Sequence, residues 1–249
     1  MKKFDATWLY STPIAHRGLY DNNVFPENTA PAYEEAIRCG YAIEIDVQMT
    51  IDNVLVVIHD DNMKRLLGVD KDVREMTYSE LKKYTPYNKG YPILTFSEFL
   101  KLVDGKTPIL IEVKHQKRKG IEALLVNELK NYNGEFAVQS FNPNIVKRVN
   151  TLAKHFVIGV LVTREINPNV KIIIQKLIHN FYFKLYIPFD FLSIRVQDLE
   201  VSYKKAKKYN VITWTITNEE ELKIADIYAK NIIFEKTVPS LGRFGEKKF

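Results

Sequence analysis

Ionisable side chains stand at the ends of short apolar runs in the first sixty residues of this chain. The clusters that contain them are Ile14-Ala15-His16-Arg17-Gly18, Pro26-Glu27-Asn28-Thr29, Glu44-Ile45-Asp46-Val47 and Val56-Val57-Ile58-His59-Asp60. Apolar runs of this length suit strands that are buried on both faces, as in a parallel sheet. A polar residue that ends such a strand emerges at its carboxyl edge, where α/β folds bind ligands. We therefore expect these histidines, acids and the arginine to converge on one site.

Three carboxylates are placed to share that site. Glu44 and Asp46 alternate with Ile45, so both point to the same side of their strand. Glu112 holds the corresponding place in a later apolar run. Such a group repels itself unless a cation lies within it, and all-oxygen ligands select Mg²⁺ or Ca²⁺ over Zn²⁺. Taken alone, the residues leave open the alternative that each acid pairs with a neighbouring Arg or Lys.

Nine apolar runs have the length of strands and would position these side chains. They cover residues 13–18, 42–47, 54–58, 109–114, 136–141, 157–162, 191–196, 211–216 and 232–234. Most are separated by helical patterns, one of which begins at Asn167-Pro168 and carries an apolar stripe as far as Phe181. Sustained alternation over 249 residues without a linker predicts one α/β domain, a (β/α)₈ TIM barrel over residues 1–249. One run, either the last or a partner near Asp52, then lies outside the barrel.

The connection between the second and third runs is too short to hold a helix. Asp52-Asn53 could close a hairpin, which would make the two strands antiparallel. Alternatively, residues 48–53 descend in extended form and leave the strands parallel. We favour the parallel arrangement, because it brings His59 to the same end as Glu44 and Asp46.

Helix-capping patterns mark several helix starts. Asn28 and Thr29 offer side-chain caps to a helix that Gly40 stops. Two further segments have the capping-box pattern, Thr77-x-x-Glu80 and Thr95-x-x-Glu98.

Composition and charge exclude several classes of protein. The charged fraction of 27% and hydrophobic fraction of 46% are those of an ordinary globular domain. The net charge of +6 comes from scattered lysines, and without a recognisable binding module we expect no nucleic-acid partner. No run is long enough for stable membrane insertion, and the N-terminus has no signal-peptide core. These features favour a cytoplasmic protein, and they predict no particular oligomeric state.

Several short motifs together resemble a known family, the glycerophosphodiester phosphodiesterases. They recur in that family's order and approximate spacing over nearly the whole chain. They are His16-Arg17-Gly18, Pro26-Glu27-Asn28-Thr29, Gly40, Glu44-x-Asp46-Val47, His59-Asp60 followed by Arg65, Ile111-Glu112-Val113-Lys114, Gln139-Ser140-Phe141 and Trp214-Thr215.

The resemblance implies roles for the candidate residues. It makes Glu44, Asp46 and Glu112 ligands of a divalent cation. It makes His16 and His59 the catalytic acid and base, without saying which is which. Since the family acts on a phosphodiester, the two nearby cations would bind the phosphate and stabilise the negative charge of the transition state. These cations are Arg17 and Lys114, which could equally pair with the neighbouring acids.

Two aromatic residues and one insertion could contact the substrate. Phe141 and Trp214 could pack against a glycerol backbone, although an aromatic residue on a barrel strand more often belongs to the core. In the family, the region after the second histidine covers the active site. Residues 61–91 therefore resemble such a lid, and the alternative is a purely structural excursion.

The resemblance implies an enzyme of lipid and glycerol metabolism, a metal-dependent phosphodiesterase. Its substrates would be glycerophosphodiesters, which are deacylated phospholipids, and its products glycerol 3-phosphate and an alcohol. One alternative is a phospholipase C- or D-like enzyme that acts on intact lipid, for which residues 182–191 are the nearest thing to a membrane-binding patch. Another is a barrel that binds a phosphodiester without catalysis, which the presence of both histidines and all three acids argues against.

Overall fold

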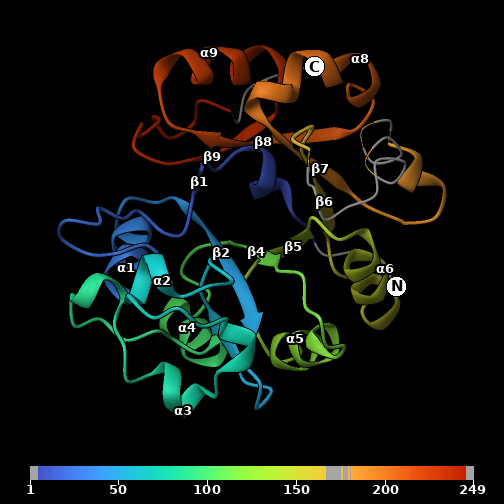
Figure 1. Ribbon diagram of the computed structural model, residues 1–249. Helices are drawn as coiled ribbons and strands as arrows, with labels where there is room; N and C mark the ends of the chain where they lie inside the picture. The colour runs from blue at the N-terminus through green and yellow to red at the C-terminus, as the bar shows by residue number, and fades with distance from the viewer. Residues whose placement is uncertain (1–4, 167–174, 176–178, 180, 245–249) are drawn as a thin grey trace. The chain divides into compact units, whose positions relative to one another are not determined.

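The protein divides into two compact units. A computed structural model describes residues 5–166, 175, 179 and 181–244 of the chain (Figure 1). One unit is Ala15–Phe136, and the other joins Met1–Ile14 to Ala137–Phe249. Most of the helix predicted from Asn167-Pro168 lies outside the described residues, which include Gln175, His179 and Phe181 of its span.

The unit formed by residues 15–136 contains the predicted pair of buried parallel strands. Strand β2 pairs with β4, with Asp46 opposite Glu112. Every residue of both strands is buried, as the apolar runs predict. The elements in chain order are α1 (Ala30–Arg38), β2 (Ala42–Met49), β3 (Leu55–Val57), α2 (Lys64–Leu67), η2 (Val73–Glu75), α3 (Tyr78–Leu81), η3 (Pro86–Asn88), α4 (Phe96–Val103), β4 (Ile109–Val113) and α5 (Ile121–Leu129).

Strands β2 and β3 form an antiparallel hairpin, so our preference for a parallel connection is wrong. Val47 faces Val57, and Met49 faces Leu55. The turn is closed by Thr50, whose N–H donates to the Val54 carbonyl at 3.0 Å. Its hydroxyl donates to Asp52 at 2.6 Å, which favours the turn over an extended chain. Strand β3 is thus the extra run outside the parallel series.

The hairpin register still brings His59 back toward the acids. The Ile58 N–H donates to the Asp46 carbonyl at 2.9 Å, so the chain returns alongside Asp46. The Gln48 amide then donates to the carbonyls of His59 and Asp60 at 3.0 and 2.8 Å. The hairpin register and the buried Gln48 therefore bring His59 toward the acids, which is what we expected parallel strands to do.

The predicted capping boxes are present at α3 and α4, but the predicted cap of α1 is wrong. At the two capping boxes, each threonine accepts from the N–H of the glutamate three residues on, and the glutamate accepts in return. Thr29 precedes α1 without capping it, and its hydroxyl instead donates to the Pro26 carbonyl at 2.6 Å. Helix α1 is held instead by packing, with the rings of Tyr33 and Phe99 of α4 4.7 Å apart.

The segment between β3 and α4 has an apolar core of its own. Helix α2 contributes Leu66 and Leu67, which are almost fully buried. They pack with Ile58 at the end of β3 and with residues further along the segment. The remaining buried members are Val56, Met63, Val73, Met76, Leu81 and Ile93.

The second unit continues the strand–helix alternation. Strands β5 to β9 pair as parallel neighbours in sequence order. Helices α8 and α9 lie side by side, with Tyr203 and Tyr228 rings 4.9 Å apart (Figure 1). None of the helices in the described ranges is long and apolar enough to cross a membrane. The elements are η1 (Thr7–Tyr10), α6 (Pro143–Leu152), β6 (Ile158–Val162), η4 (Tyr182–Leu185), β7 (Phe191–Arg195), η5 (Val196–Asp198), α8 (Leu199–Ala206), β8 (Asn210–Ile216), α9 (Glu219–Tyr228) and β9 (Asn231–Phe234), with β1 (Ile14–Ala15) and β5 (Phe136–Ser140) where the chain passes between units.

Candidate active site

The His16-Arg17-Gly18 motif forms a tight turn directly after β1. Arg17 and Gly18 both have left-handed backbone angles, with φ of 55° and 84°. A Cβ atom on Gly18 would lie 2.9 Å from the backbone of Ala32, so only glycine fits there. The turn points the Arg17 N–H at Glu44, to whose carboxylate it donates at 3.1 Å. The motif therefore attaches the end of β1 to the acids of β2.

The Pro26-Glu27-Asn28-Thr29 motif supports the same acids from another side. The Asn28 N–H donates to the Arg17 carbonyl at 3.0 Å. Its side-chain amide donates to Asp46 at 3.3 Å and accepts from the Tyr33 hydroxyl at 2.9 Å. Asn28 is buried and, like Arg17, has a positive φ of 55°. Sequence reasoning gave Asn28 only a capping role and missed its contact with Asp46, which nothing in its local sequence indicates.

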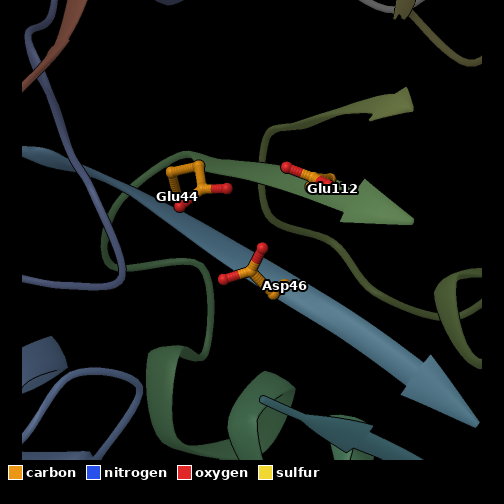
Figure 2. Close-up of side chains that lie close together, drawn as sticks. All are labelled: Glu44, Asp46 and Glu112. Atoms are coloured by element: carbon orange, nitrogen blue, oxygen red, sulfur yellow. The ribbon is translucent and has the colours of Figure 1, made fainter. Parts of the chain in front are cut away.

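The three predicted acids lie together. Glu44 and Asp46 extend from β2 and Glu112 from the neighbouring β4, as Figure 2 shows. One carboxylate oxygen from each lies within 4.8 Å of the others, and all three residues are buried. The alternation of Glu44 and Asp46 along β2 and the parallel register with β4 produce this cluster.

Burial and mutual repulsion set the charges of these acids. Burial, followed by repulsion from Asp46 and Glu112, raises the pKa of Glu44 well above its usual range. Burial also acts to raise the pKa of Asp46, but the positive charges of Lys114 and Arg17 outweigh it and hold that pKa low. The two acids therefore differ: Asp46 stays ionised, while Glu44 resists ionisation in the absence of an added cation.

Both predicted phosphate-binding cations contact the acid cluster. The Lys114 ammonium lies 2.9 Å from Glu112 and 3.3 Å from Asp46. The Arg17 guanidinium lies 3.4 Å from Asp46. The sequence-based alternative of acid–base pairing is thus present in the structure, and it does not exclude contact of the same cations with a phosphate.

The donor set fits a hard divalent cation. All the candidate ligand atoms are carboxylate oxygens, the ligands that Mg²⁺ and Ca²⁺ prefer. One oxygen of Asp46 is buried without a hydrogen bond from any described residue and lies 3.3 Å from the Lys114 ammonium. A cation between the three acids would satisfy that oxygen and relieve the repulsion that raises the Glu44 pKa.

Both predicted histidines belong to the unit that holds these acids. His16 follows β1, and His59 follows β3. Positive charge on either histidine acts to lower the pKa of Asp46, which places both rings near that carboxylate. The His59 Nδ1 lies 2.8 Å from an Asp60 carboxylate oxygen. Two imidazoles beside a charged cluster are suited to proton transfer near neutral pH.

A second group of charges, which sequence reasoning left without a role, adjoins the histidine. The buried Glu27 accepts from both Arg17 and Arg65, and these bonds outweigh burial and lower its pKa. Asp60 accepts from His59 and Arg65, and its pKa is also lowered, against the effect of burial. Both acids occur in recognised motifs, but only the fold reveals that Arg65 joins them.

Phe141 and Trp214 lie in the other unit. Their rings meet edge to face, with centroids 5.3 Å apart. The Trp214 indole N–H donates to the Ser193 carbonyl at 3.1 Å, while Phe141 is 39% exposed. The structure brings these two aromatic residues together, and their contact with a substrate stays a prediction.

Comparison with a solved structure defines the class of fold. A phosphodiesterase of Oleispira antarctica, solved in complex with the product sn-glycerol-3-phosphate, matches with a TM-score of 0.72 and 22% identity. The match covers 93% of this chain and 96% of that one. The fold is accordingly a (β/α)₈ TIM barrel, as the strand–helix alternation predicts.

Comparison of sequences defines the family. The model of the glycerophosphoryl diester phosphodiesterase family matches residues 16–234, and the chain belongs to this family of phosphoric diester hydrolases. A glycerophosphodiester phosphodiesterase of Caldanaerobacter subterraneus subsp. tengcongensis is 37% identical over 160 residues, which cover 59% of this chain and 65%, just under two thirds, of that protein. The Bacillus subtilis protein YhdW is 32% identical over 222 residues, covering 83% of this chain and 86% of its own length. The resemblance drawn from the short motifs is confirmed.

Proposed function

We propose that this protein hydrolyses glycerophosphodiesters to glycerol 3-phosphate and an alcohol in a cation-dependent reaction. The observation that carries the proposal is the buried cluster of three acids within 4.8 Å, flanked by Arg17 and Lys114. Family membership and the product bound by the Oleispira antarctica phosphodiesterase support the choice of substrate. A cytoplasmic location stays a prediction.

Glu44, Asp46 and Glu112 would hold the cation, Mg²⁺ or Ca²⁺. A divalent ion supplies positive charge that polarises a phosphoryl oxygen. Arg17 and Lys114 would contact the remaining phosphate oxygens: arginine can grip two at once, while lysine acts as a point charge. Because both already lie against the acids, a bound phosphate would complete an existing cluster of alternating charge.

His16 and His59 would move the protons. One imidazole takes the proton of the attacking hydroxyl as its oxygen forms a bond to phosphorus. The other donates a proton to the leaving alkoxide as the second P–O bond breaks. With the glycerol 2-hydroxyl as nucleophile, the first product is a cyclic phosphodiester, which water opens with the two roles exchanged. Asp60 would hold the His59 ring in place for these transfers.

Other parts of the chain would shape substrate access. Residues 61–91 would border the site and limit substrate access, as a lid does. This insertion is joined to the site by Arg65 and packs on β3 through its own apolar cluster. Phe141 and Trp214 would pack against the substrate's carbon chain.

Release of glycerol 3-phosphate from glycerophosphocholine tests the proposal directly. The protein is stripped of divalent ions, and Mg²⁺ or Ca²⁺ is restored separately. We expect activity to disappear on stripping and to return with one of the two ions. Glu112→Gln should abolish both this recovery and the rise in melting temperature that the ion produces. Activity that survives full chelation would contradict the role of Glu44, Asp46 and Glu112 as ligands.

One observation favours a second candidate function, action on intact lysolipid at a membrane surface. Helix η4 and the residue after it expose Tyr182, Leu185 and Tyr186, at 52%, 66% and 73% of their surface. A 380 Å³ pocket adjoins them, and its lining within the described residues includes five lysines and no acid. The lysines are Lys184, Lys204, Lys205, Lys207 and Lys208.

Exposed aromatic and aliphatic side chains among lysines are suited to an anionic lipid surface. The same stripping and restoration of ions separates the two candidates when lysophosphatidylcholine, in vesicles that contain an anionic lipid, is compared with glycerophosphocholine. Choline release is the readout for both, because lysophosphatidylcholine yields choline and an acylated glycerol phosphate, and no glycerol 3-phosphate. Faster turnover of the lysolipid than of glycerophosphocholine would favour the second function, and the reverse would favour the first.

A further inference from the structure

Arg65 lies between two acids that serve different parts of the proposed site. It belongs to the short helix α2 within residues 61–91. Its Nη1 and Nη2 donate to the two carboxylate oxygens of Glu27 at 2.9 and 2.8 Å. Its Nε and Nη2 donate to the two oxygens of Asp60 at 2.7 and 2.9 Å. Such paired contacts fix the orientation of all three groups, because the guanidinium is planar and rigid.

Each of these acids also contacts one residue of the proposed active site and so helps to orient it. Glu27 accepts from Arg17 Nη1 at 2.7 Å. Asp60 lies 2.8 Å from Nδ1 of His59. Basic and acidic side chains therefore alternate along a chain of contacts from Arg17 through Glu27, Arg65 and Asp60 to His59. Arg65 is the residue that connects the proposed phosphate-binding arginine to the proposed proton-transfer histidine.

The contact with Asp60 determines which nitrogen of His59 can exchange protons with a substrate. A carboxylate paired with an arginine is ionised and can only accept hydrogen bonds. His59 must then carry a hydrogen on Nδ1 to make its 2.8 Å contact with Asp60. This leaves Nε2 for proton transfer. A carboxylate that rotated away would release the ring to adopt the other tautomer.

Arg65 is itself held firmly, although 44% of its side chain is exposed. The next two residues, Leu66 and Leu67, are buried in the apolar cluster that joins α2 to β3. Nη1 of Arg65 also donates to the Tyr87 hydroxyl at 2.5 Å. Packing of the neighbouring residues in the insertion thus holds the Arg65 guanidinium in place.

We propose that Arg65 is a positioning residue for phosphodiester hydrolysis, which fixes the His59 tautomer through Asp60 and the place of Arg17 through Glu27. The proposal rests on the proposed function of the site. It assigns the insertion a part in catalysis, through a residue that does not itself touch the substrate.

Arg65→Met tests the proposal, and Arg74→Met is its matched control. Arg74 belongs to the same insertion and also pairs with two aspartates, Asp61 and Asp72, but neither of these contacts a histidine or an arginine of the site. We expect Arg65→Met to lower kcat by about tenfold to a hundredfold, the usual cost of losing a partner that orients a ligand. Arg74→Met should keep kcat, and Arg65→Lys should restore part of the loss, because an ammonium cannot grip both carboxylates.

A second measurement does not depend on the substrate. The ¹⁵N NMR shifts of the imidazole nitrogens report the tautomer of His59, which is assigned by comparison with His59→Gln. We expect the Nδ1–H tautomer in the wild type and in Arg74→Met, and a mixture of tautomers in Arg65→Met. Equal kcat values and equal His59 shifts in the two methionine variants would overturn the proposal. If the wild type releases no glycerol 3-phosphate at all, the substrate is wrong, and the NMR comparison still tests Arg65.

Discussion

Two pairs of parallel strands in this protein bury polar side chains with opposite consequences. Strands β2 and β4 bury Glu44, Asp46 and Glu112. Strands β7 and β8 bury Ser193 and Thr213. Both pairs have the same parallel ladder and are built largely from apolar residues, so the backbone does not distinguish them. Only the chemistry of the inward polar groups does.

The Thr213 hydroxyl is satisfied by the backbone of the next strand, whereas the Ser193 hydroxyl is buried without a hydrogen bond from the described residues, and the carboxylates draw donors from other segments. The Thr213 hydroxyl donates to the Ile194 carbonyl at 2.7 Å, which offsets the cost of its burial. Ionised carboxylates only accept hydrogen bonds, so a group of three needs donors or cations from elsewhere. Arg17, Asn28 and Lys114 supply these from three separate segments. A buried polar group that draws partners from distant segments thus indicates a site, whereas one satisfied by the next strand indicates structure.

Removing a histidine beside the carboxylate pair should have the largest effect. We expect His59→Ala or His16→Ala to lower kcat for glycerophosphocholine by about a hundredfold to ten-thousandfold, the range for loss of a general acid or base. Both rings are only half-buried, so the melting temperature should change little. Near-wild-type turnover in either variant would remove that histidine from the mechanism.

Neutralising one acid should stabilise the protein when divalent ions are absent. The raised pKa of Glu44 means that the folded state binds its proton more tightly than the unfolded chain does. Folding stability is therefore lost as the pH rises from the unfolded pKa of this group to its folded pKa. Glu44→Gln removes that loss. In urea unfolding with chelator present, the free energy of unfolding of Glu44→Gln should rise relative to that of the wild type across this pH range. At higher pH the difference should stay constant.

The acids held by cations give the opposite sign and act as the control. Asp46, Glu27 and Asp60 have lowered pKa values, because their cationic partners outweigh burial. Their stabilisation is present above the unfolded pKa and is lost as the pH falls through the lower folded pKa. Asp60→Asn should therefore reduce stability near neutral pH, and its difference from the wild type should shrink in acid. If Glu44→Gln and the wild type had the same free energy of unfolding in chelator at every pH, the inference that the crowded acids repel one another would be contradicted.

Local sequence predicted the strands and two of the caps because local physics decides them. Apolar runs long enough to be buried became strands, and the threonine–glutamate pairs of α3 and α4 closed as capping boxes. The same reasoning failed where another local hydrogen bond formed in place of the predicted arrangement. Thr29 donates to the Pro26 carbonyl instead of capping α1, and the turn at Thr50 and Asp52 makes β3 antiparallel.

Contacts between distant segments were beyond local reasoning. The predicted acids, histidines and cations were named from strand ends and from motif resemblance, and the structure gathers them in the unit of residues 15–136. The pairing of Glu27 with Arg65 spans 38 positions in sequence. Such a pairing depends on where the insertion packs, which no periodicity or spacing records. The role of Asn28 was missed for the same reason.

The smallest effect should come from Thr213, whose buried hydroxyl bonds to the backbone of the next strand. Thr213→Val keeps the shape of the side chain and removes its hydrogen bond to the Ile194 carbonyl. We expect a loss of about 1 kcal/mol in the free energy of unfolding and no change in kcat or KM. Urea titration and the glycerol 3-phosphate assay measure the two quantities on the same sample. A drop in kcat larger than about twofold would mean that β8 contributes to the reaction through Thr213, and the contrast between the two strand pairs would fail.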